Sequence, residues 1–302
     1  MSRKRKRRIV EAEQKPFLIV LGIAQDGGVP HIGTRSSAWN NRPERRYAAS
    51  LGIVDPRSNQ RWIIEATPDV KEQLHRLDEA APFHSVPAGF LSGIAITHAH
   101  VGHYLGLAFF GKEMMNGKNI PLYTMPKMGQ FLSENLPWSD LIANGNVLPH
   151  ELQPDIPFQL NERITLTPLL VPHRDEQSET VGFRVQGSER SILFIPDIDR
   201  WDDWDAWGRR VEEEIEQVDV AYLDGTFFDE RELPGRDMAK IPHPTIRSSI
   251  ERFAPLPESE RKKIRFIHLN HSNPALRHGS PERNLVESTM AAIAEEGEEI
   301  TL

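Results

Sequence analysis

The 302-residue sequence contains no cysteine. This absence excludes disulfide bonds, thiolate zinc sites and cysteine nucleophiles, and it is typical of a reducing compartment such as the cytoplasm. Any transition metal bound by this chain must therefore be held by histidine and carboxylate side chains. The sequence has 12 histidines from which such a site can be built.

Long apolar runs are lacking as well. No stretch approaches the roughly 20 apolar residues that a membrane-spanning helix needs, so no membrane partner is expected. The longest apolar run near the start covers residues 17–24 and follows a basic opening. It continues into Gln25-Asp26-Gly27-Gly28, which lacks the small-x-small pattern of a cleavage site. We therefore predict a buried strand there and not a secretory signal.

Positive charge is scarce outside the first residues. The net charge is −8, and residues 3–8 hold six of the 36 basic residues. The remaining chain carries 30 basic against 44 acidic residues, a net charge of −14. So acidic a body disfavours a nucleic-acid partner and favours a small-molecule substrate. We predict a disordered basic tail over residues 1–15 and a single domain over residues 16–302.

Strand pairs precede helical segments in each half of the chain. Residues 48–54 and 61–65 form one predicted pair, and residues 180–185 and 191–195 form another. Helices are expected from residue 68 to about residue 77, and over residues 201–217 and 281–296. This order favours an α+β fold in which two sheets pack together with helices outside them.

Three histidines directly follow the short apolar strand 93–96, in the pattern His98-x-His100-x-x-His103. A spacing of two along extended chain puts His98 and His100 on the same side, and a turn into a helix brings His103 round. A cluster of hydrogen-bonded histidines without a metal is the simpler alternative. However, three imidazoles gathered at one strand end are typical of a site for zinc, iron or manganese.

Three later candidates share this strand-end position: His173, Asp197 and His271. A carboxylate such as Asp197 can bridge two metal ions or complete one tetrahedron. His268 lies three residues before His271 and is the alternative final ligand. Alternation along the strand favours a packed position for His268, so the sequence favours His271.

The order His98, His100, His103, His173, Asp197, His271 resembles the metallo-β-lactamase superfamily. The resemblance spans roughly residues 17–275 and implies a four-layer αββα sandwich with metal ions at one edge of its two sheets. It implies one site from His98, His100 and His173, and a second from His103 and His271 with Asp197 as a bridge. The superfamily's aspartate before the third histidine is Gly102 here, which predicts a weakened second site.

Within the superfamily, segments 22–30, 65–69, 120–123 and 270–274 are similar to the pyrroloquinoline-quinone biosynthesis protein B group. The cysteines that this group carries after the glycine turn are missing here, and Thr34 stands near the first of their positions.

The resemblance implies a hydrolase with one or two zinc ions, or iron or manganese in their place. An activated water would attack an ester, amide or phosphodiester, and Asp197 would orient it. His243-Pro244-Thr245 resembles the His-x-Thr element of the tRNase Z and phosphodiesterase branches, where the histidine assists the reaction, although a surface histidine at a helix start is an equal alternative. Two other functions stay open: an iron-dependent oxygenase related to quinone-cofactor biosynthesis, and a non-catalytic metal-binding or sensing domain.

Overall fold

The computed structural model describes residues 15–33, 44–82, 90–233, 235 and 242–302. The predicted basic tail, apart from Lys15, and Thr34 lie outside these residues.

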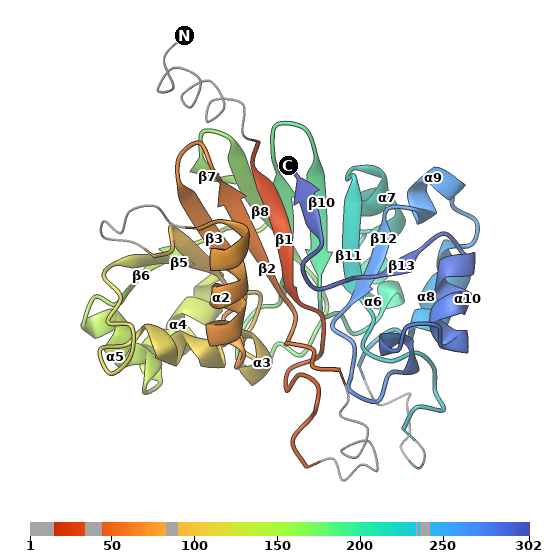
Figure 1. Ribbon diagram of the computed structural model, residues 1–302, viewed down its shortest axis with the longest axis horizontal. Helices are drawn as coiled ribbons and strands as arrows, with labels where there is room; N and C mark the ends of the chain where they lie inside the picture. The colour runs from red at the N-terminus through yellow and green to blue at the C-terminus, as the bar shows by residue number, and fades with distance from the viewer. Residues whose placement is uncertain (1–14, 34–43, 83–89, 234, 236–241) are drawn as a thin grey trace.

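Two mixed sheets face each other in the described part of the chain (Figure 1). The first sheet has the order β14 (Glu299–Thr301), β1 (Phe17–Gly22), β2 (Ser50–Asp55), β3 (Gln60–Ile64), β4 (Gly93–Ala95), β5 (Ile120–Thr124) and β6 (Val147–Glu151). The second sheet has the order β13 (Ala292–Ile293), β12 (Ile264–Ile267), β11 (Val220–Asp224), β10 (Ser191–Ile195), β9 (Val181–Gln186), β8 (Ile164–Leu170) and β7 (Phe158–Asn161).

Helices cover the outer face of each sheet, as Figure 1 shows. The first sheet carries α2 (Val70–Ala80), α3 (Val101–Tyr104), the 3₁₀ helix η2 (Leu105–Phe110), α4 (Pro126–Glu134) and α5 (Trp138–Ala143). The second carries α6 (Trp201–Ala206), α7 (Val211–Glu216), α8 (Ile246–Phe253), α9 (Glu258–Arg261), η4 (Pro274–Leu276) and α10 (Pro281–Ser288). Within the described ranges, every helix is too short or too polar to span a bilayer.

Three apolar clusters separate these four layers. Leu51 and Phe183 belong to the cluster between the two sheets. Leu77 packs with the outer face of the first sheet, and Phe253 with that of the second. Because the central strands β1, β10 and β11 are buried on both faces, they are nearly continuous apolar runs, whereas the edge strands β6 and β7 are partly exposed. The predicted αββα sandwich is thereby confirmed.

Parallel pairing brings the carboxyl ends of several strands to one edge. In the first sheet β3, β4 and β5 are parallel neighbours, and in the second sheet β10, β11 and β12 are parallel neighbours. The polar segments that follow these strands therefore emerge on the same side of the sandwich. This arrangement positions the candidate site.

Three predicted helices differ from the observed ones. The segment 201–217 forms two helices, because Gly208 between them has a positive φ of 82°. The last helix ends at Ser288, Met290 turns the chain with a φ of 76°, and β14 then pairs with β1. The first helix begins at Val70, because Thr67 Oγ1 accepts the Asp69 N–H ahead of the helix.

Candidate metal centre

His98, His100 and His173 meet at the edge where β4 and β8 end. His98 Nε2 lies 2.8 Å from His100 Nδ1, and His173 Nε2 lies 3.3 Å from the same atom. Metal–nitrogen bonds of about 2.0–2.1 Å in a tetrahedron separate the ligand atoms by about 3.3 Å. The three nitrogens therefore have the spacing of a site for one zinc-sized ion, and they are the group that the resemblance implies.

The other ring nitrogens of this group are held by neighbours. Thr97 Oγ1 lies 2.8 Å from His98 Nδ1, and Asp199 Oδ1 lies 2.8 Å from His173 Nδ1. These partners orient the rings of His98 and His173 so that their Nε2 atoms face the shared space, which His100 faces with Nδ1. Burial, reinforced by the nearby imidazole of His103, lowers the pKa of His98 well below its ordinary value. A neutral imidazole is the form that binds a metal.

A second group of donors lies beside the first: Asp26, His103 and His268. Asp197, directly after β10, lies between the two groups. Its Oδ2 is 2.9 Å from His103 Nε2 and 3.4 Å from His268 Nε2, and it is 3.7 Å from His98 Nε2. The position expected of a bridging carboxylate is therefore occupied by Asp197.

The predicted final ligand, His271, does not join either group. Its ring stacks on that of His31, with centroids 4.3 Å apart and an interplanar angle of 19°. His268 occupies the place expected for His271, because β12 ends at Ile267 and His268 has a φ of 64°. Strand alternation does not apply at such a residue, and the structure brings His268 rather than His271 to the other donors.

Hydrogen bonds also orient His268 toward the centre. Its Nδ1 lies 3.0 Å from Thr226 Oγ1, and that hydroxyl donates to Asp224 Oδ1 at 2.7 Å. The hydroxyl therefore accepts the Nδ1–H of His268, which leaves Nε2 free for a metal. Asp224, the last residue of β11, thus supports the His268 imidazole through Thr226.

Two acidic residues of the centre were missed from the sequence: Asp26 and Glu65. Glu65 is fully buried, and its Oε1 lies 3.3 Å from His103 Nδ1. Glu65 directly follows β3. The position after a strand end made Asp197 a candidate ligand in the sequence, and the same reasoning identifies Glu65. Asp26, Glu65 and His268 have positive φ angles of 23°, 75° and 64°. Such angles are uncommon outside glycine and concentrate at functional sites.

The carboxylates favour a cation at this position. Burial alone would lower the pKa of His103, but Glu65, Asp197 and Asp26 raise it well above its ordinary value. Burial would raise the pKa of Asp197, but His268 and His103 hold it well below the usual range. Protons and metal ions therefore compete for these donors.

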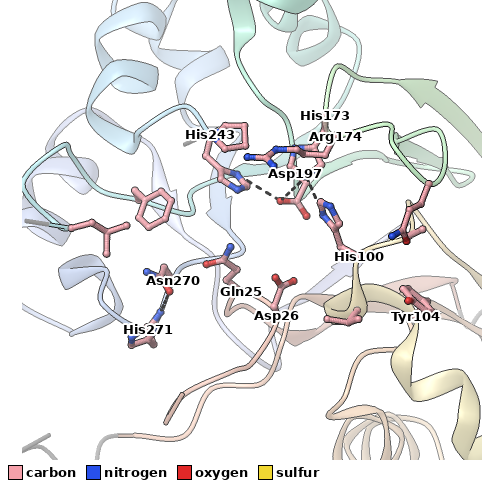
Figure 2. A pocket seen from close by; sticks show the side chains of 16 residues that line it. Gln25, Asp26, His100, Tyr104, His173, Arg174, Asp197, His243, Asn270 and His271 are labelled. Carbon is pink, nitrogen blue, oxygen red and sulfur yellow. Dashed lines mark hydrogen bonds and ion pairs between the residues drawn. The ribbon is translucent and has the colours of Figure 1, made fainter. Parts of the chain in front are cut away.

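An open cavity of about 800 Å³ leads to these donors. Figure 2 shows Asp197 between His243 and His100, with Tyr104 farther away on the side of His100. His243 Nδ1 lies 2.8 Å from Asp224 Oδ2. Burial alone would lower the pKa of His243, but Asp224 raises it to about 9. His243 thus lies at the cavity and not at an exposed helix start.

This chain is similar to known proteins over most of its length. The model of the family described as "Beta-lactamase superfamily domain" matches residues 60–269. Coenzyme PQQ synthesis protein B of Xanthomonas axonopodis pv. citri (strain 306) is 25% identical over 314 residues, which cover 94% of this chain and 99% of that protein.

Two solved structures share the fold. The crystal structure of Zn(2+)-bound PqqB from Methylobacterium extorquens has a TM-score of 0.77 and 22% identity, and the match covers 95% of this chain and 100% of that one. A diphosphatase from the PhnP family has a TM-score of 0.65 and 20% identity, with 96% and 98% covered.

Proposed function

The chain belongs to the family of β-lactamase superfamily domains and is similar to coenzyme PQQ synthesis protein B, and from this premise we propose that it is a zinc-dependent hydrolase of small molecules. The scissile bond would be an ester, an amide or a phosphodiester. The solved relative named as zinc-bound supports the choice of metal, and the acidic body disfavours a nucleic-acid substrate. We also infer a cytoplasmic location from the lack of cysteine.

The observation that carries this proposal is the pair of donor groups joined by Asp197 at the base of an open cavity. His98, His100 and His173 would hold one ion, and His103 and His268 would contribute to a second. Hydrolysis needs a water nucleophile beside a site for the substrate, and the cavity supplies room for both.

Bound zinc supplies Lewis acidity, which lets water act as a nucleophile near neutral pH. Asp197 lies where its carboxylate can orient that water and accept a hydrogen bond from it. The new bond joins the water oxygen to the carbon or phosphorus of the substrate, and the bond to the leaving group breaks. His243, held at Nδ1 by Asp224, is in place to donate a proton to the departing atom.

Metal analysis of protein purified without added metal tests the centre. We expect at least one zinc per chain, and we expect His98→Ala to lose both the zinc bound at His98, His100 and His173 and the hydrolysis of ester and phosphodiester substrates. His75→Ala, at an exposed position of α2, is the matched control and should keep both. Full metal content in His98→Ala would refute the assignment.

Dominant iron with oxygen consumption would support the oxygenase alternative, and full metal without turnover would support a sensing domain.

Leaving groups of different basicity test the assignment of His243. A proton donor matters for a poor leaving group such as an alkoxide but little for p-nitrophenolate. We expect His243→Gln to slow alkyl phosphodiester or ester hydrolysis about 10²–10⁴-fold, with metal content unchanged and a much smaller effect on p-nitrophenyl substrates. Equal losses on both substrates would argue against proton donation by His243.

A further inference from the structure

The loop after β1 supplies a carboxylate where the histidine motif lacks one. We propose that Asp26 is the carboxylate ligand of the second metal position, and that residue 102 is glycine because Asp26 fills the space of its side chain. This inference rests on the proposed function, since it presupposes a metal centre. It assigns to Asp26 the place that a carboxylate at position 102 would otherwise take.

The space at Gly102 supports this exchange. A Cβ added to Gly102 would lie 1.9 Å from Asp26 Oδ1 and 2.6 Å from both Cγ and Cα of Asp26. Real Cβ atoms essentially never approach other atoms so closely. Asp26 in its observed position and any side chain at position 102 therefore exclude each other.

The distances around Asp26 match a metal position. Asp26 Oδ1 lies 3.4 Å from His103 Nε2 and 3.7 Å from His268 Nε2. Asp197 Oδ2 lies 2.9 Å and 3.4 Å from the same two nitrogens. A tetrahedral zinc ion separates its ligand atoms by about 3.3 Å. Each of the two nitrogens thus lies near an oxygen of both carboxylates, at spacings close to those of a tetrahedral zinc site.

Hydrogen bonds leave these four donor atoms unsatisfied, although ion-pair contacts link them. Asp26 Oδ1, His103 Nε2, His268 Nε2 and Asp197 Oδ2 are all buried, and none makes a hydrogen bond of acceptable geometry within the described residues. Buried polar atoms without partners are destabilising, and four at one point are rare in folded proteins. A shared cation satisfies all four at once.

Backbone contacts hold Asp26 beside the other donors. The N–H of Gln25 donates to the carbonyl of Leu269 at 2.8 Å, and the N–H of Gly28 donates to Gln25 at 2.8 Å. The first of these bonds ties the loop to the residue that follows His268. Figure 2 shows the Asp26 side chain directed from this loop toward Asp197.

Zinc stoichiometry measured at a buffered free-zinc concentration tests the proposal. We expect two zinc ions per chain in the wild type and one in Asp26→Asn. When cobalt replaces zinc, the absorption bands of the cobalt ion at the second position should be missing from Asp26→Asn. Gly102→Ala should also drop to one zinc, although it removes no donor atom, because its methyl group displaces Asp26. Asp175→Asn, an exposed carboxylate on a neighbouring loop, is the matched control and should keep two.

The exchange variant Asp26→Gly/Gly102→Asp provides the rescue. Glycine tolerates the φ of 23° at position 26 and lets the loop move away from the new side chain, so we expect this variant to regain the second zinc. Circular dichroism and thermal unfolding check that each variant is folded. If the exchange variant does not fold, Asp26→Asn and Gly102→Ala decide the question.

The outcomes separate this inference from the proposed function. If Asp26→Asn still binds two zinc ions with unchanged affinity, the assignment of Asp26 is overturned. The same holds if the wild type binds a single zinc ion and His98→Ala removes it. Both results leave the hydrolase proposal standing. A wild-type protein that binds no zinc would overturn the metal centre itself.

Discussion

Replacement of the buried Glu65 by glutamine should weaken the second metal position selectively. Glu65 Oε1 lies 3.3 Å from His103 Nδ1, and Oε2 accepts the Thr97 N–H at 3.4 Å. Glutamine has the same shape but only one acceptor oxygen, so it can face only one of these two N–H groups favourably. Either His103 loses the partner that orients its ring, or the Thr97 N–H meets a donor.

The burial of Glu65 sets the size of this effect. Loss of a partner that orients a metal-bound histidine costs about 10–100-fold in metal affinity. Glu65 is 0% exposed, so water cannot replace the lost acceptor, and we expect the upper end of that range. A 100-fold loss corresponds to about 2.8 kcal/mol of binding free energy.

Competition with a chromophoric chelator measures both zinc-binding steps in one titration. The position formed by His98, His100 and His173 serves as an internal reference, because Glu65 is not in contact with its ligand atoms. Glu79→Gln, at an exposed position of α2, is the control for loss of a carboxylate. If both dissociation constants in Glu65→Gln stay within about twofold of the wild type, an equivalent of roughly 0.4 kcal/mol, then Glu65 does not position His103.

Two further substitutions test the site and the fold. His268→Ala should lose one zinc while His271→Ala keeps both, because His271 stacks on His31 away from the donors; release of zinc by His271→Ala alone would restore it as the ligand. Arg61→Met should lower the free energy of unfolding by about 2–4 kcal/mol. The substitution removes the buried guanidinium that pairs with Asp78 and donates to the carbonyls of Phe90 and Ala81. Urea denaturation measures this change, and a loss under about 0.5 kcal/mol would show that other groups or water replace the arginine.

The fold class and most of the donors could be predicted from the sequence. His98, His100, His103, His173 and Asp197 each lie close after an apolar strand. A strand is recognised from its own residues, and parallel strands end at the same edge of a sheet. Residues that follow such strands are therefore brought together whatever the details of packing. The resemblance to the metallo-β-lactamase superfamily depended on this same order.

The choice between His268 and His271 depended on tertiary contacts. The N–H of Leu269 donates to the carbonyl of Ile23, which directly follows β1, and the N–H of Asn270 donates to that of Thr226 in a neighbouring loop. These bonds fix the chain where β12 ends and accompany the left-handed backbone of His268. No local pattern in the sequence encodes them, so alternation along the strand favoured His271, whereas the fold brings His268 to the other donors.

The carboxylate beside His103 shows most clearly what the sequence decides and what the tertiary structure decides. The sequence determined that position 102 carries no carboxylate, and by itself this predicted a weakened second site. Only the tertiary structure placed Asp26, 76 positions earlier in the chain, against Gly102 and among the donor atoms. The physical reason is that strand and helix periodicity acts between neighbours in sequence, whereas the volume around a metal position is shared by segments that meet only when both sheets have packed.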